Sequence, residues 1–366
     1  MSMNSIYRGD KLSLEIYGES HSPSIGVLIE GLPADVKPEE DKTAAFMKRR
    51  APGQNAWSTP RKEKDEVHFE EKDGKLHGFI INTNTKPKDY AKIMNTPRPS
   101  HADYTARLKY GEEASKSGGG IFSGRMTAPL CIAGSIAMQQ LSKMGVEIYA
   151  HVKSIAGVND ASYFDYTPLS AEFKKSMTEV ASKEFPVVLD EAGEMMKAKI
   201  EEARMEEDSV GGIVECVIYG MPKGIGGPIF SGIEGKIAQM IYAVPAVKGV
   251  QFGNGYDIAE LKGSENNDAF GYDENGELHL LTNHSGGILG GISVGGSVAP
   301  IVFDCAMKPT PSISKEQKTV DLAEHKNTTI TIEGRHDPCI VPRAVPVIEA
   351  AAAIAIYDMI LASKEG

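Results

Sequence analysis

The sequence lacks the residue spacings that mark several common classes of protein. Its four cysteines, Cys131, Cys216, Cys305 and Cys339, are scattered and form no CxxC pair. This distribution argues against a zinc site and against a disulfide framework, and it fits a reducing cytosol. The N-terminus also lacks the long apolar stretch of a secretory signal peptide, so we expect none.

Positive charge is in short supply as well. The 39 Lys and Arg residues face 50 Asp and Glu residues, which leaves a formal net charge of −11. A general nucleic-acid binder normally carries a basic balance or a dominant basic patch, and neither is present. An acidic chain that binds an anionic ligand must concentrate its positive charge locally, as residues 48–50 and 61–62 do.

Signatures for common cofactors are missing, and the two serines that we consider as nucleophiles lack theirs. Neither GxGxxG nor GxxxxGK[ST] occurs, which disfavours a Rossmann or P-loop nucleotide cradle. HExxH and HxxxH are absent, and the acidic turn at residues 265–268 does not fit an EF-hand, so we predict no metal site. Ser20 and Ser123 are candidate nucleophiles, but neither lies in a GxSxG elbow.

Glycine, by contrast, is abundant, with 38 residues. The glycines have no fixed period and interrupt apolar segments, which indicates many tight turns and close backbone approaches rather than a linker. No break in composition marks a domain boundary. We therefore expect one large domain of mixed helices and strands over residues 1–366.

Hydrophobic periodicity predicts the main elements. The segment 11–31 is expected to form a strand, a polar loop and a second strand at 25–29. Further strands are expected at 67–70, 78–82, 146–155, 213–219, 246–252, 278–282, 291–301 and 328–332. Helices are expected from about 31 to 46 and at 126–144, 190–207, 230–244 and 344–363. We expect residues 49–65 to form an exposed loop and residues 160–184 to form surface helix and loop. The last helix is long enough to span a bilayer, but Glu349 and Asp358 inside it favour a buried helix of a protein that does not enter a membrane.

Three polar clusters follow predicted strands or precede a predicted helix, at residues 18–22, 98–128 and 334–338. Loops at the ends of strands are frequent locations for active sites. His21 is either a general acid or base or a residue that caps a turn. His101 is flanked by Arg98 and Asp103, and Asp337 is either a base or an ion-paired turn residue.

The second cluster also contains three consecutive glycines, Gly118 to Gly120, ahead of a predicted helix. Glycine lets backbone N–H groups approach a ligand, and the N-terminus of a helix favours an anion. Arg98 and Arg125 can add bidentate contacts to phosphate or carboxylate. Together the clusters indicate an anionic small molecule and a phosphate-bearing cofactor held by irregular loops.

The long motifs in these clusters resemble those of the chorismate synthase family. They are GESHS at 18–22, RPSHADYT at 98–105, SGGGIFSGRMTA at 117–128 and GRHDPCIVPRAVPVIEA at 334–350. Further stretches agree in order at 208–212, 245–256, 263–268, 282–293 and 308–313, so the resemblance spans about residues 10 to 360. Departures from the family pattern include Ser22 and Ile121, where Gly and Arg are common.

The resemblance implies an α+β fold, a β-α-β sandwich with helices between antiparallel sheets, in a cytoplasmic homotetramer. It implies the last step of the shikimate pathway, in which 5-enolpyruvylshikimate-3-phosphate loses phosphate and a C6 proton in a 1,4-anti elimination. The reaction needs reduced FMN, without net redox change. No flavin reductase domain is visible, so reduced flavin would come from another protein or from anaerobic chemistry; the resemblance also implies a link to NADP.

The resemblance also carries over site residues by position. It implies catalytic roles for His21 as a proton donor toward the flavin, for His101 near the departing phosphate and for Asp337 near flavin N5. Substrate would be bound by Arg49, Arg50, Arg98, Arg125 and Arg335. FMN would be bound by Ser123, Pro245, Ala246, Gly290, Lys308, Pro309, Thr310, Pro311, Ser312 and Arg335.

Two other functions stay open at this point. A phosphatase or phosphotransferase that uses the Arg and His residues would release phosphate without flavin. A non-catalytic flavin or phosphometabolite binder would bind FMN but would not turn over substrate.

Overall fold

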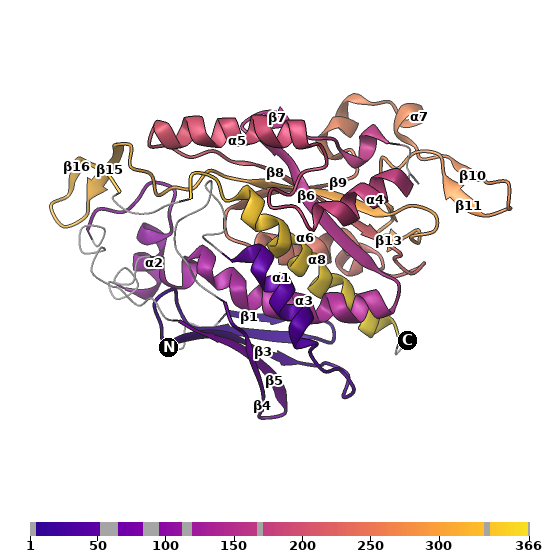
Figure 1. The fold of residues 1–366 in the computed structure, drawn as a ribbon, viewed down its shortest axis with the longest axis horizontal. Helices are drawn as coiled ribbons and strands as arrows, with labels where there is room; N and C mark the ends of the chain where they lie inside the picture. Colours follow the sequence, from indigo (N-terminus) through magenta and orange to yellow (C-terminus); the bar gives the residue numbers. More distant parts are fainter. Residues whose placement is uncertain are drawn as a thin grey trace.

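Two five-stranded antiparallel sheets enclose a layer of helices (Figure 1). The computed structural model describes residues 5–51, 65–82, 95–111, 119–166, 171–332 and 337–364. The first sheet consists, in spatial order, of β1 (Ser5–Arg8), β2 (Ser13–Tyr17), β3 (Ser24–Glu30), β5 (Lys75–Ile81) and β4 (His68–Lys72). The second consists of β7 (Val158–Asn159), β6 (Glu147–Ile155), β8 (Gly212–Tyr219), β14 (Ile301–Met307) and β9 (Val247–Phe252).

Helices lie between the sheets and on one outer face. The inner layer contains α1 (Glu40–Arg50), α3 (Thr127–Lys143), α6 (Ile233–Tyr242) and α8 (Val341–Ser363). The outer face of the second sheet is covered by α4 (Ala171–Val180) and α5 (Asp190–Met205) (Figure 1). The predicted β-α-β sandwich is confirmed.

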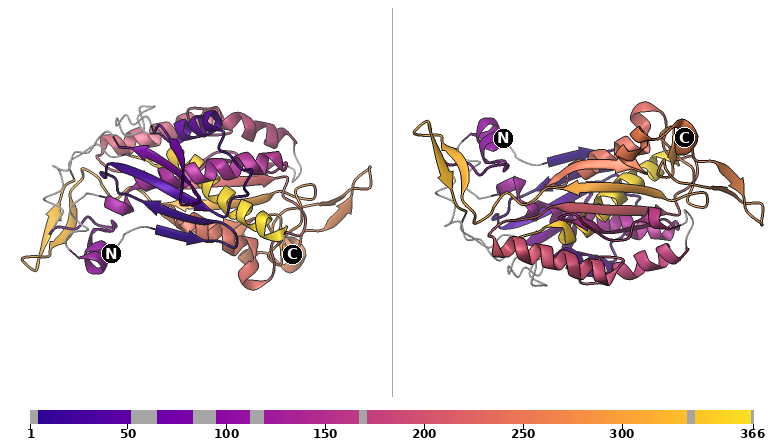
Figure 2. Two further views of the ribbon diagram at one scale, coloured as in Figure 1. Left: turned by 90° about the horizontal axis from the view of Figure 1, so that it is seen from below. Right: turned by 90° about the horizontal axis from the view of Figure 1, so that it is seen from above.

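The remaining elements are short and lie toward the ends of the molecule. They are α2 (Asp103–Tyr110), α7 (Gly263–Asn266), the hairpin β12 (Ile288–Leu289) with β13 (Ile292–Ser293), the hairpin β10 (Phe270–Tyr272) with β11 (Leu278–Leu280), and the hairpin β15 (Gln317–Asp321) with β16 (Lys326–Ile330). The last two hairpins project from opposite ends of the sandwich (Figures 1 and 2). The described start of the second polar cluster leads into α2 beside the β15–β16 hairpin, where the Thr319 hydroxyl donates to the Pro97 carbonyl oxygen at 2.6 Å.

The C-terminal helix α8 is the centre of the inner layer. Between Val341 and Ile360 every residue except Arg343 is buried. Among the described residues it is the one helix long and apolar enough to cross a membrane, and 94% of its apolar window is buried inside the protein. Its Asp358 side chain accepts hydrogen bonds of 2.6–2.8 Å from three consecutive backbone N–H groups at residues 10–12. The prediction of a buried helix is confirmed, and its acidic residue anchors the turn between β1 and β2.

The structure corrects part of the predicted exposed loop at 49–65. Residues 52–64 lie outside the described residues, but Arg49 and Arg50 form the last turn of α1. Arg50 and Asp65 are both buried, because their side chains form an ion pair of 2.7 Å. Cationic residues in a last turn also interact favourably with the helix dipole, which extends α1 past the predicted end at Phe46.

Other predicted boundaries also shift. The strand predicted at 291–301 is wrong over most of its length, since residues 292–293 form β13 and the long strand is β14 at 301–307. The segment 160–184 is less superficial than predicted, because Tyr163, Phe173 and Met177 form a buried cluster against the second sheet. Elements β1, α2 and β15 were not predicted, since each is short and largely polar.

Helices α3 and α8 meet closely at Gly134. A Cβ atom built on Gly134 would lie 2.3 Å from the Cβ of Ala350 and 2.5 Å from its Cα. Real side chains do not approach backbone atoms that closely, so a larger residue at this position would push the two helices apart. Glycine is required here for close packing, since the residue has ordinary helical geometry.

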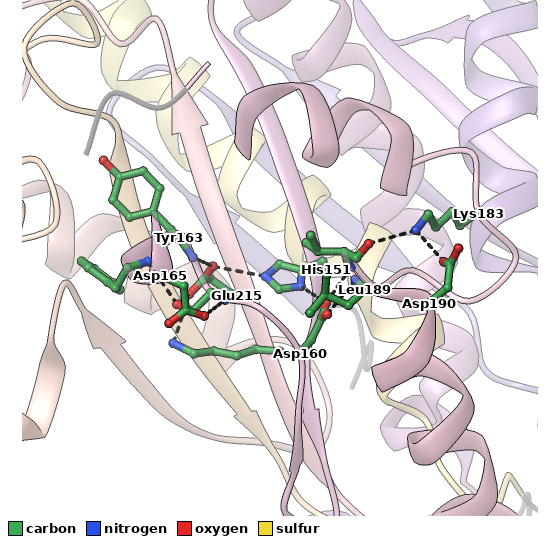
Figure 3. A network of polar contacts seen from close by, with 12 residues as sticks. His151, Asp160, Tyr163, Asp165, Lys183, Leu189, Asp190 and Glu215 are labelled. Atoms are coloured by element: carbon green, nitrogen blue, oxygen red, sulfur yellow. Dashed lines mark hydrogen bonds and ion pairs between the residues drawn. The ribbon is translucent and has the colours of Figure 1, made fainter. Parts of the chain in front are cut away.

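A buried polar network joins the second sheet to the chain that covers its outer face (Figure 3). His151 is fully buried, and its Nδ1 and Nε2 atoms lie 3.0 Å from Asp160 Oδ2 and 3.1 Å from Glu215 Oε2. Burial opposes a charge on the imidazole, but the two carboxylates outweigh burial and raise the pKa of His151 to about 9. His151 is therefore a buried imidazolium at neutral pH.

Replacement of Gly134 tests the helix contact. We expect Gly134→Ala to lower the free energy of unfolding by about 1–3 kcal/mol, because the added methyl group overpacks the α3–α8 crossing. The matched control is Gly235→Ala in α6, where an added Cβ meets open space and the intrinsic helix propensity of Ala is expected to stabilise by about 0.5–1 kcal/mol. Urea denaturation measures both values, and a stabilising effect of Gly134→Ala would contradict the proposed contact.

The imidazolium predicts a loss of stability in alkali. Because the pKa of His151 in the folded state is raised above the ordinary value of 6.5, its contribution is complete below pH 6.5 and disappears as the pH rises through about 9. This group alone should lower the free energy of unfolding by on the order of 3 kcal/mol between pH 6.5 and 10. Urea denaturation across this range should show this decrease in the free energy of unfolding in the native protein. The control His325→Asn, which replaces an exposed histidine, should show the same decrease. In His151→Gln the free energy of unfolding should depend much less on pH. An equal pH dependence in all three proteins would refute His151 as its cause.

Candidate active site

His21 lies in the turn between β2 and β3, where the turn is closed by Ser22. The Ser22 hydroxyl donates to the Ser24 carbonyl oxygen at 2.6 Å. The backbone N–H of Ser20 donates to the carbonyl oxygen of Gly120 at 3.3 Å. The fold thereby brings the first predicted cluster against the last glycine of the second, although about 100 residues separate them in the sequence.

A single buried carboxylate joins two of the predicted arginines. Asp65 contacts Arg50 Nη1 at 2.7 Å through Oδ2 and forms a short ion pair with Arg125 Nη1 through Oδ1. Arg125 Nη2 also donates to Asn82 Oδ1 at 3.1 Å, and Asn82 Nδ2 donates to the Ser22 carbonyl oxygen at 2.8 Å. The guanidinium of Arg125 is thus oriented from two sides and connected to the turn that carries His21.

The other arginine of the second cluster, Arg98, is held by Asp103 and contacts His101. Arg98 Nε and Nη2 donate to the two carboxylate oxygens of Asp103, both at 2.7 Å. His101 Nδ1 lies 2.6 Å from Asp103 Oδ1, and Arg98 Nη1 donates to Ser312 Oγ at 3.1 Å. Burial opposes ionisation of Asp103, but the hydrogen bonds from Arg98 and His101 outweigh it and hold the pKa of Asp103 well below its usual range.

The segment 308–312, predicted to bind FMN, runs between these clusters. Lys308 Nζ donates to the Ser100 carbonyl oxygen at 2.5 Å, and the Lys308 N–H donates to the Ala246 carbonyl oxygen at 3.0 Å. Further along, the Thr310 hydroxyl donates to the Asp337 carbonyl oxygen at 2.8 Å. One extended segment therefore contacts the loop of His101 at one end and the loop of Asp337 at the other.

Asp337 forms an ion pair with Arg343, in the first turn of α8. Arg343 Nη1 lies 2.6 Å from Asp337 Oδ2. Burial lowers the pKa of the Arg50 guanidinium; Asp65 opposes this effect, and the nearby charges of Arg343 and Arg125 add to it. Arg343 is therefore close enough to Arg50 for their charges to interact, which links the Asp337 pair to the Asp65 cluster.

Several predicted residues lie apart from these contacts or beyond the described part of the chain. Arg49 points into the helical layer, where its guanidinium makes a two-point ion pair with buried Glu349 at 2.6 and 2.9 Å. Gly290 lies in the turn of the β12–β13 hairpin with φ of +62°. Arg335 lies outside the described residues. The other predicted FMN residues are adjacent in sequence to those above: Ser123 caps the 3₁₀ turn that holds Arg125, Pro245 precedes Ala246, and Pro309 and Pro311 flank Thr310.

Sequence reasoning missed Asp65, Asn82 and Arg343. Charge balance was the available signal, because a buried guanidinium needs a carboxylate partner and the predicted substrate arginines outnumbered the predicted acids. Nothing in the sequence indicates which of the 50 acidic residues takes that place. Arg343 lies in a motif that was recognised, but its contact with Asp337 depends on how α8 begins.

A GxSxG match that sequence reasoning did not consider occurs at residues 291–295, around Ser293. Ser293 is buried in β13, where its hydroxyl donates to the Pro222 carbonyl oxygen at 2.5 Å and accepts from the Ile225 N–H at 3.0 Å. It does not occupy a strand-to-helix elbow, so the match does not indicate a hydrolase. Over the described ranges, no group of three or more His, Cys, Asp or Glu side chains is arranged to hold a metal ion.

The fold and the site define an α+β protein with arginines, histidines and glycine loops suited to an anionic ligand. A sequence profile of the chorismate synthase family matches residues 12–361. Chorismate synthase from Lancefieldella parvula is 43% identical over 364 residues, covering 96% of this chain and 94% of the relative. The chorismate synthase of Methanocaldococcus jannaschii is 41% identical and covers 96% and 95%.

A solved structure of a protein named chorismate synthase has the same fold. It superposes with a TM-score of 0.73 at 24% identity and covers 98% of this chain and 94% of its own. The chain belongs to the chorismate synthase family. Its function is that of the family: a carbon–oxygen lyase in the last step of the shikimate pathway.

Removal of the charge on Asp65 tests the arginine cluster. We expect Asp65→Asn to lower the free energy of unfolding by roughly 3–5 kcal/mol, because it leaves two largely buried guanidiniums without their shared counterion. Urea denaturation measures the change. Glu202→Gln, which removes an exposed partner of Lys199, should leave stability unchanged. Equal stability of Asp65→Asn and the native protein would contradict a structural role for the cluster.

Proposed function

We propose that the lyase reaction of this chain is the 1,4-anti elimination of phosphate and a C6 proton from 5-enolpyruvylshikimate-3-phosphate, with reduced FMN as the cofactor. One observation supports the proposal above all. The segment 308–312 contacts Arg98 through Ser312 and the Asp337 loop through Thr310. Residues predicted for substrate, for cofactor and for proton transfer are therefore neighbours in one site.

The residues present fit a phosphate-bearing cofactor. Burial and the nearby charge of Lys248 lower the pKa of Lys308, so the two ammonium groups repel each other. A phosphate beside them would relieve this repulsion. The left-handed backbone of Ala246, with φ of +75°, turns the chain next to Lys308. We assign FMN to Ser123, Pro245, Ala246, Gly290, Lys308, Pro309, Thr310, Pro311, Ser312 and Arg335.

The substrate carries one phosphate and two carboxylates, and therefore needs several cations in one site. Arg98 is oriented by Asp103 and Ser312, and Arg125 is oriented by Asp65 and Asn82. This orientation prepares both guanidiniums for an anion at little further entropic cost. We propose that Arg335 joins them. Arg49 and Arg50, paired with Glu349 and Asp65, would act on the substrate mainly through their positive potential.

Four side chains have proposed roles in the chemistry. When bound, reduced FMN supplies electron density that assists carbon–oxygen cleavage. His101 and Arg98 stabilise the negative charge that develops on the departing phosphate, an interaction that is strongest in the transition state. His21 donates a proton toward the flavin. Asp337, held by Arg343, accepts a proton in the region of flavin N5.

The wider setting is also proposed from the family. We infer a cytoplasmic homotetramer that receives reduced flavin from an external source, either a separate reductase linked to NADP or anaerobic reduction. The buried state of all four cysteines is compatible with a reducing compartment.

The reaction gives a direct test. Purified protein mixed anaerobically with 5-enolpyruvylshikimate-3-phosphate and reduced FMN should release chorismate and phosphate in equal amounts. We expect His101→Asn to lower kcat by roughly 10²–10⁴-fold, because a positioned acid–base group is lost. His279→Asn, on β11 at the opposite end of the molecule from α2 (Figure 1), is the matched control and should keep native kcat.

The same assay separates the alternatives. Phosphate released without flavin would support a phosphatase or phosphotransferase. Tight FMN binding with no product, and no effect of His101→Asn, would support a non-catalytic binder. Failure of the native protein beside an active control enzyme would overturn the proposed reaction.

A further inference from the structure

The imidazole of His101 has one ring nitrogen that faces two partners of opposite character. Its Nδ1 atom lies 2.6 Å from Asp103 Oδ1 and 3.0 Å from Arg98 Nη2. A carboxylate oxygen would require a proton on Nδ1, whereas a guanidinium nitrogen would require a lone pair there. The two contacts cannot both be hydrogen bonds of a single neutral tautomer, and the choice between them decides which proton His101 can exchange.

The surroundings of Asp103 settle the choice. Its Oδ2 atom accepts from the Arg98 backbone N–H at 3.0 Å and from Arg98 Nε at 2.7 Å, and its Oδ1 atom accepts from Arg98 Nη2 at 2.7 Å. A carboxylate with this many donors is ionised and has no proton to give. At 2.6 Å, Nδ1 must therefore supply the proton, because two facing lone pairs at that distance would repel. The Nη2 hydrogen directed at Oδ1 is then satisfied without His101.

We infer that Asp103 is a positioning residue that fixes His101 as the Nδ1–H tautomer and leaves Nε2 as the atom that exchanges a proton with the ligand. The inference rests on the proposed function for the identity of that ligand, but the tautomer itself does not. In the neutral imidazole Nε2 is then a bare acceptor. In the imidazolium it is a donor that can be directed at the departing phosphate.

The loop is built to hold this arrangement. Ser100 has φ of +57°, a left-handed turn that lets the backbone and the side chain of Arg98 both reach Asp103. Asp103 is the first residue of α2, where the helix dipole favours a negative charge. Two contacts from another segment also hold the loop: Lys308 donates to the Ser100 carbonyl oxygen, and Ser312 accepts from Arg98. The orienting carboxylate is thus itself fixed by contacts that do not involve the imidazole.

Nitrogen-15 spectra can read the tautomer without substrate or flavin. Solid-state NMR of the full-length protein with ring-labelled histidine, compared with the same protein carrying His101→Asn, isolates the two ring signals of His101. We expect a protonated Nδ1 and a bare Nε2 in the neutral form. In Asp103→Asn the Arg98 donors are released to point at Nδ1, so we expect the signals to move to the Nε2–H tautomer. A bare Nδ1 in the native protein, or an unchanged tautomer in Asp103→Asn, would overturn the inference.

Kinetics distinguish positioning from a general loss of structure. We expect Asp103→Asn to lower kcat by roughly 10²-fold, because the wrong tautomer impairs the proton step. KM should rise as well, because Arg98 loses the carboxylate that orients it. Asp190→Asn, which alters an exposed aspartate at the first position of α5, should leave both constants unchanged. Parallel loss of kcat and melting temperature in Asp103→Asn, with no change of tautomer, would show a purely structural role.

The NMR and kinetic experiments together also separate this inference from the proposed reaction. If the native protein shows the Nδ1–H tautomer but forms no chorismate, the proposed reaction fails and the positioning of His101 stands. If it forms chorismate with the Nε2–H tautomer, the reaction stands and the role of Asp103 is refuted.

Discussion

The pairing of arginine with carboxylate inside the protein is the interaction on which the rest of this site depends. Asp65 holds Arg50 and Arg125, Asp103 holds Arg98, and Asp337 holds Arg343. Removal of a guanidinium from water is costly unless a counterion and hydrogen bonds replace the solvent. Some of these pairs join loops that are distant in sequence, and others fix the conformation of a single loop. The contacts that neutralise the arginines therefore also assemble the site. Although the chain is acidic overall, such pairs allow it to hold several arginines close together, as Asp65 does for Arg50 and Arg125.

The sandwich determines where these loops can meet. Helices α3 and α8 approach closely at Gly134, and the first residues of both helices carry site residues or lie directly beside them. Arg125 occupies the turn that leads into α3, and Arg343 lies in the first turn of α8. Displacement of one helix against the other would therefore move Arg125 relative to Asp337. Core packing and the geometry of the site are coupled through these two helices, although the packed residues touch no ligand.

The sequence was sufficient to predict the regular elements with clear periodicity, and insufficient where an element is short or polar. The helices α3, α5 and α8 have long apolar or amphipathic patterns and were predicted nearly to their ends. The eight-residue helix α2 is polar and lies inside a motif read for its chemistry, so its helical character was overlooked. His21, His101 and Asp337 could be proposed because their motifs are distinctive. Asp65 could not be proposed, because its importance arises only when the fold places it beside Arg50 and Arg125.

The balance of charge in the site bears on how an anionic substrate is accepted. Among the described residues of the cluster, Arg50, Arg98, Arg125 and Arg343 face Asp65, Asp103 and Asp337, which leaves an excess of about one positive charge before the histidines and lysines are considered. A substrate with a phosphate and two carboxylates brings more negative charge than this excess. Lys308, Lys248 and a protonated imidazole are the groups at hand to compensate it. An anion beside Nε2 of His101 favours the imidazolium, because opposite charges stabilise each other at short range. Substrate binding would in this way favour a proton on Nε2, which the departing phosphate later requires. This effect requires that Nε2, not Nδ1, faces the ligand.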